Sequence, residues 1–145
     1  MENLKILEKT INSELTSKII SSKINHNQIH ISIEDNNLIE VMLFLKTNSI
    51  TKFRQLIDLT AVDYPEKDKR FRMIYLLLSH ETNSRIVLDY NIKEGEFIPS
   101  ITTIYPSANW MEREVFDMYG IQFTNHPDLR RILTDYNFNG FPLRK

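Results

Sequence analysis

The chain has 145 residues, a formal net charge of −1 and no cysteine. This length is typical of one domain, and the balanced charge argues against a nucleic-acid binder, which needs basic excess to neutralise phosphates. The lack of cysteine excludes disulfides, thiolate metal sites and a thiol nucleophile. The three glycines, Gly95, Gly120 and Gly140, are too widely spaced to form a phosphate-binding loop.

The first part of the chain predicts two amphipathic helices on either side of a strand. Apolar residues recur at three- and four-residue spacing from Leu4 to Ile19, which predicts a helix. Residues 28–34 alternate between apolar and polar, as in a half-buried strand. Residues 35–37, Asp-Asn-Asn, predict a turn and a helix cap before a second helix at residues 38–45.

The next segment, residues 53–64, has a mixed pattern. Phe53, Leu56 and Ile57 favour a helix, whereas residues 59–63 favour extended structure. Pro65 ends the segment, because the residue before a proline avoids the helical conformation.

A hairpin follows. Residues 71–79 are apolar on both faces, as in a central strand, and residues 85–92 alternate again. The polar stretch 81–84 predicts the turn between them, and residues 98–105 predict one more short strand.

The last periodic segment is a helix over residues 107–119, with Gly120 at the position after the helix where a left-handed residue is favoured. We expect its core face to consist of Ala108, Met111, Val115 and Met118.

Together these elements predict an α+β fold: a single two-layer domain over residues 1–120, with a mixed β-sheet and helices packed on it. Residues 121–145 have no sustained period, yet they are rich in aromatic and aliphatic side chains. Such a segment is more typical of a chain lying in a groove than of a disordered end. We therefore expect an extended C-terminal tail over 121–145 that docks on a neighbouring subunit.

The densest cluster of charged residues lies at 112–117. On a helix Arg113 and Asp117 are four residues apart and can pair. Glu112 and Glu114 point about 160° apart, so they do not form an acid–base pair in one cleft. Glu112 also follows Asn109 by three residues, which resembles a capping arrangement. The cluster favours docking over catalysis.

His126 is followed by proline and aspartate, but the other histidines are far away in sequence, so a metal site is not expected. After residue 126 the chain carries four positive side chains against two aspartates. The guanidinium group of an arginine at an interface can bind a carboxylate through two hydrogen bonds. We therefore expect the tail to dock in an acidic groove of a partner.

Three stretches of the sequence resemble the signature of one family. They are ANWMEREVFDMYGI at 108–121, HPDLRRILTDY at 126–136 and PLRK at 142–145. They resemble the thirty-kilodalton subunit of respiratory complex I, and LIDLTAVDYP at 56–65 is similar to a further stretch of that family. Phe141 stands where the family usually has histidine, and the family usually continues past Leu-Arg-Lys, so we expect a shortened arm.

The resemblance implies a cofactor-free core subunit of the peripheral arm, with FMN and iron–sulfur clusters held by partner subunits. It would brace the forty-nine-kilodalton quinone-site subunit while the complex transfers electrons from NADH to quinone and pumps protons. No catalytic, cofactor or metal residue is expected in this chain. The residues expected at the subunit interface are Glu112, Arg113, Asp117, His126, Arg130, Arg131, Tyr136, Phe138, Phe141 and Arg144.

Two alternatives stay open at this point. The same domain could belong to a related membrane-bound hydrogenase assembly, or the chain could be a small hydrolase that uses Glu112, Asp117 and His126. No import signal is visible, and the bias toward isoleucine and asparagine indicates AT-rich coding DNA. These features favour the matrix side of the mitochondrial inner membrane over the cytoplasmic side of a bacterial inner membrane.

Overall fold

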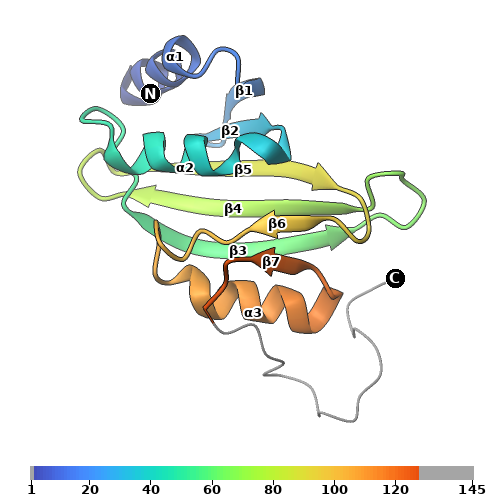
Figure 1. Ribbon diagram of the computed structural model, residues 1–145. Helices are drawn as coiled ribbons and strands as arrows, with labels where there is room; N and C mark the ends of the chain where they lie inside the picture. The colour runs from blue at the N-terminus through green and yellow to red at the C-terminus, as the bar shows by residue number, and fades with distance from the viewer. Residues whose placement is uncertain (1, 128–145) are drawn as a thin grey trace.

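The computed structural model describes residues 2–127 (Figure 1). The elements follow one another as α1 (Glu2–Glu14), β1 (Ile19–Asn25), β2 (Gln28–Ile33), the 3-10 helix η1 (Asp35–Asn37), α2 (Leu38–Thr47), β3 (Gln55–Asp63), β4 (Phe71–Ser79), β5 (Ser84–Ile92), β6 (Phe97–Pro99), α3 (Ala108–Tyr119) and β7 (Gln122–Thr124).

The main sheet has five strands in the order β1-β2-β5-β4-β3. Strands β2 and β5 run parallel, whereas the other neighbouring pairs are antiparallel. Short strands β6 and β7 form a separate parallel pair. Figure 1 shows α2 crossing in front of the sheet and α3 lying beyond β3. The predicted α+β fold with a mixed sheet is confirmed.

The hydrophobic core lies on one face of the sheet. Every second residue of β4 is buried, and the matching residues of β5 are buried opposite them. Tyr75 and Tyr90 are both fully buried on these strands, and their hydroxyl oxygens are 2.7 Å apart. The helices cover this face with side chains such as Leu7, Ile11 and Met42.

Two early predictions were wrong in part. Ile19 belongs to β1 and not to the first helix, which ends at Glu14. Residues 55–63 are extended throughout, because β3 pairs with β4 along its length. The pairing register shifts once, between Leu56 and Asp58. Pairing with a neighbouring strand here overrides the local helical spacing.

The chain around α3 follows the prediction at Gly120 and departs from it elsewhere. Gly120 is left-handed, with φ of 76°, and its N–H donates to the Phe116 carbonyl at 2.8 Å. The strand expected at 98–105 is reduced to β6, and residues 102–104 form a turn. After Gly120 the chain forms β7, and Ile121 and Phe123 are buried, so the packed domain continues beyond residue 120.

Candidate interface helix and its buried carboxylate

The buried face of α3 contains two acidic residues. Its buried residues are Ala108, Glu112, Val115 and Asp117, whereas Met111 is only partly buried. Of the expected core face, Ala108 and Val115 are buried, Met111 is partly buried and packs against the core, and Met118 is only partly buried. The prediction missed the two buried carboxylates. The helix is rotated so that a carboxylate points inward, and a buried carboxylate needs hydrogen-bonding partners.

Glu112 has those partners in the loop that follows β6. The Ser100 hydroxyl donates to one carboxylate oxygen at 2.6 Å, and the Ile101 backbone N–H donates to the other at 2.9 Å. The Glu112 side chain is fully buried. Glu112 thus ties the loop to α3, and the capping arrangement expected with Asn109 was wrong.

Burial also changes the acidity of this group. Loss of hydration raises the pKa of Glu112 to about 7, against the opposing effect of the hydrogen bonds from Ser100 and Ile101. Both protonation states of Glu112 are therefore accessible near neutral pH.

His126 lies beside Glu112. Its Nε2 atom is 3.0 Å from the Asn109 carbonyl oxygen and 3.8 Å from a Glu112 oxygen. A carbonyl oxygen only accepts hydrogen bonds, so this nitrogen must carry a proton. Both side chains have no exposed surface. The structure therefore brings together two of the three residues of the hydrolase alternative, in a place closed to solvent.

The outward side of α3 carries an ordered aromatic group. Trp110 is half exposed, and its indole N–H donates to Glu114 at 2.6 Å. The Arg113 guanidinium lies 5.4 Å from the centre of the Trp110 ring, within the range of a cation–π contact. Glu112 and Glu114 indeed face different environments, as the helical spacing predicted. Tryptophan and arginine are enriched at protein interfaces, so this is the surface of α3 suited to docking.

The remaining predicted interface residues divide into two groups. Asp117 is fully buried, so its carboxylate lies inside the domain. The other six lie outside the described residues: Arg130, Arg131, Tyr136, Phe138, Phe141 and Arg144. Their contact with a neighbouring subunit stays a prediction.

A buried ion pair was missed at the sequence level. Arg70 donates to both carboxylate oxygens of Asp63, at 2.6 Å from Nε and 2.9 Å from Nη2, and the Asp63 side chain has no exposed surface. The contact raises the pKa of Arg70 through the hydrogen bond to Asp63. The available signal was the alternation of β3, which places Asp63 in register with buried Ala61 and Leu59.

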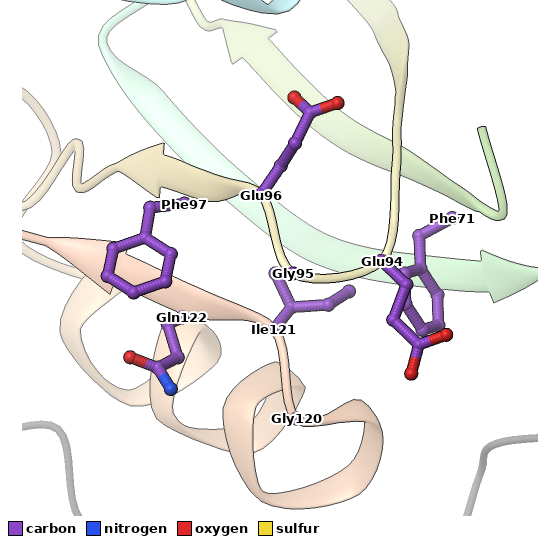
Figure 2. Close-up of a pocket in the computed structure, with 8 residues that line it drawn as sticks. All are labelled: Phe71, Glu94, Gly95, Glu96, Phe97, Gly120, Ile121 and Gln122. Carbon is purple, nitrogen blue, oxygen red and sulfur yellow. The ribbon is translucent and has the colours of Figure 1, made fainter.

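A surface hollow lies between the turn before β6 and the turn before β7 (Figure 2). It has a volume of about 280 Å³ and is lined by apolar side chains, two glycines, Gln122, Glu94 and Glu96. Glu94 accepts from Arg70 at 3.2 Å, and Glu96 accepts from the Lys93 backbone N–H at 3.0 Å. Among the described residues, its lining includes no histidine and no hydroxyl side chain.

Within residues 2–127, no group of three or more histidine, aspartate or glutamate side chains is placed to hold a metal ion. In the same part of the chain, no helix is long and apolar enough to cross a membrane.

The chain is similar to proteins of known family. A family model described as respiratory-chain NADH dehydrogenase, 30 Kd subunit, matches residues 31–145. A subunit of the NADH-quinone oxidoreductase of Ruegeria pomeroyi is 52% identical over 127 residues, which is 88% of this chain and 64% of the relative. Its counterpart in Ruegeria sp. (strain TM1040) is 48% identical over 145 residues, covering 100% of this chain and 72% of the relative. The chain thus spans about two-thirds of the length of these relatives.

Two solved structures have a similar fold. A trypsin-resistant fragment of Nqo5 has a TM-score of 0.71 at 25% identity, covering 88% of this chain and 99% of the fragment. A chain of the archaeal membrane-bound sulfane sulfur reductase has a TM-score of 0.80 at 20% identity, covering 94% of this chain and 79% of that one. The second likeness concerns the fold alone.

Proposed function

Because this chain belongs to the family of the 30 Kd subunit of respiratory-chain NADH dehydrogenase, we propose that it is a core subunit of the peripheral arm of a proton-pumping NADH:quinone oxidoreductase. The observation that carries the proposal is the 52% identity to a subunit of a bacterial NADH-quinone oxidoreductase over 88% of the chain. The chain contributes to the oxidoreductase as a scaffold, without a redox centre of its own.

The arrangement of α3 supports a scaffolding role. Glu112 is used inside the domain to hold the loop at Ser100 and Ile101, while Trp110 and Arg113 form an ordered group on the outside. A rigid helix that presents an aromatic residue and an arginine suits docking to another protein.

The partner in this proposal is the forty-nine-kilodalton quinone-site subunit, which the chain braces together with other peripheral-arm subunits. FMN and the iron–sulfur clusters belong to those partners. The chain then lies beside the membrane through the complex. The similarity to bacterial relatives supports a location at the cytoplasmic face of a bacterial inner membrane. The composition bias toward isoleucine and asparagine favours the alternative location, the matrix side of the mitochondrial inner membrane.

The test is fractionation of solubilised membranes on a native gel, followed by mass spectrometry of the band that contains the chain. The expected result is co-migration with NADH-oxidising activity and with the flavin and quinone-site subunits. Co-migration with hydrogenase subunits instead would replace the proposal by the hydrogenase alternative. Migration as a free protein would overturn both.

The hydrolase alternative has one observation in its favour, the 3.8 Å approach of His126 to Glu112. Burial of both side chains argues against it, because a substrate would have no access. Alanine substitution of Glu112, Asp117 and His126 separates the two functions. Lost assembly supports the scaffold, whereas normal assembly with a lost hydrolytic turnover supports the hydrolase.

A further inference from the structure

The main sheet has a second face that takes no part in the hydrophobic core. On β4 the buried residues alternate with partly exposed ones, and three of the latter are aliphatic: Ile74, Leu76 and Leu78. Val87 on β5 is also partly exposed and lies opposite Leu76. We call these four residues the aliphatic strip. The core of the described domain includes none of them.

The strip is continuous and central. Leu76 pairs with Val87 across β4 and β5, and Thr60 of β3 lies opposite Ile74. Antiparallel neighbours on one face lie within contact distance, so the strip forms one apolar surface. Sheet faces of this kind are normally covered by a second layer, as α2 covers the other face in Figure 1. A contiguous group of partly exposed aliphatic side chains on a sheet face is a candidate interaction surface.

The border of the strip has an uneven charge. On the β3 side the exposed carboxylate of Asp58 lies opposite Leu76 and accepts from the Leu59 backbone N–H at 2.8 Å. At one end Arg72 is bonded to Asp89, which also accepts from Ser32 at 2.6 Å, so this group is already neutralised. At the other side Lys23 and Arg85 are exposed, and neither makes a salt bridge or side-chain hydrogen bond within residues 2–127. The two cations therefore remain available to carboxylates of a partner.

His30 lies beside Lys23 on this face. It is opposite Lys23 on one side and Val87 on the other. Its Nε2 atom is buried and has no hydrogen-bond partner in the described structure. Partial burial, with the nearby Lys23, lowers the pKa of His30. Its unpartnered Nε2 atom can make one further hydrogen bond. A covering partner with polar side chains would supply it.

We propose that this face binds an amphipathic helix of another subunit, which covers the aliphatic strip with apolar side chains and presents carboxylates to Lys23 and Arg85. The proposal rests on the proposed function, since it needs a multisubunit complex. A helix fits because the surface is the face of a sheet, where backbone groups are already paired, and not an edge.

The positive charges of Lys23 and Arg85 favour this occupant over the chain's own segment 128–145 and over a second copy of the chain. The chain's own segment 128–145 carries Arg130, Arg131, Arg144 and Lys145 against two aspartates, so it would bring like charge to Lys23 and Arg85. A second copy of the chain would present the same two cations again. A helix with aspartate or glutamate beside its apolar stripe can pack on the aliphatic strip and form ion pairs with Lys23 and Arg85.

The test uses the full chain assembled in its complex. A photo-crosslinking amino acid replaces Leu76 in one variant and Ile6, an exposed residue of α1, in the control. In parallel, Arg85→Glu is compared with Lys9→Glu, which reverses an exposed cation on α1. Incorporation of each variant into the complex is measured on native gels, and thermal melts of the purified chain check that both variants fold.

The expected result is a crosslink from position 76 to an acidic amphipathic helix of one other subunit, and several-fold lower incorporation of Arg85→Glu than of Lys9→Glu. A crosslink to residues 128–145 or to a second copy would overturn the proposal, as would equal incorporation of the two variants. The proposed function fails separately, if the unmodified chain does not enter an NADH-oxidising complex at all.

Discussion

Glu112 shows why a charged residue in a helix can have a role that its neighbours in sequence do not reveal. Its spacing is compatible with a cap, a surface ion pair or an interface contact. The structure gives it a different role, because the loop at Ser100 supplies two donors and the core removes water. Those donors come from residues eleven and twelve positions away, which no local pattern links to Glu112.

The pKa of Glu112 gives the first prediction, on stability and pH. Because the folded state raises this pKa from 4.5 to about 7, it keeps a proton that the unfolded chain releases. The free energy of unfolding should therefore fall as pH rises from about 4.5 to about 7, by up to about 3 kcal/mol. Glu112→Gln cannot titrate and should remove this part of the pH dependence.

Urea unfolding of the two proteins at several pH values between about 5 and 8 measures the difference. Glu114→Gln is the matched control, because Glu114 lies on the outer side of α3 beside Trp110, and it should keep the wild-type slope. An unchanged slope in Glu112→Gln would show that another group titrates in this range.

At the scale of elements, the success of sequence analysis followed the strength of local periodicity. In strands β2, β4 and β5 apolar residues recur at every second position, and in helices α2 and α3 they recur at helical spacing. These five elements were predicted close to their observed bounds. Strand β1, with two serines and a lysine in its interior, has no such signal and exists because it pairs with β2. Strand β7 has three residues and likewise depends on β6. In the site, the different orientations of Glu112 and Glu114 on α3 were predicted from the helical spacing, but the contact between Glu112 and the loop was not.

The Tyr75–Tyr90 pair gives the prediction at this scale. Each hydroxyl is buried between β4 and β5, where the two hydroxyls form a hydrogen bond with each other. Tyr75→Phe would leave the Tyr90 hydroxyl without that partner and should lower the free energy of unfolding by about 1–2 kcal/mol. The double variant Tyr75→Phe/Tyr90→Phe removes both polar groups and should be more stable than either single variant. Denaturant unfolding of all four proteins measures the coupling, and simple additivity would contradict it.

At the scale of the whole molecule, the domain has surfaces of different chemistry outside its core. One face of its sheet carries the core, the other exposes the aliphatic strip, and the outer side of α3 carries Trp110 and Arg113. The near-zero net charge of the chain combines an acidic part, with 14 lysine and arginine residues against 17 aspartate and glutamate residues up to residue 126, with a basic segment after it. Separate surfaces of different chemistry suit a protein that contacts more than one neighbour.

The last prediction concerns the basic segment, which lies outside the described residues and is argued from sequence. If its arginines pair with carboxylates on a partner subunit, Arg130→Ala should reduce incorporation into the complex and leave the melting temperature of the isolated chain unchanged. Arg54→Ala is the control, because Arg54 is an exposed cation that pairs with Glu81 of the same chain, and an exposed ion pair contributes little to stability. Native gels and thermal melts of both variants give the two readouts. A fall in melting temperature for Arg130→Ala as large as its loss of assembly would indicate that Arg130 stabilises its own domain, because a residue that only docks on a partner has nothing to stabilise when that partner is absent.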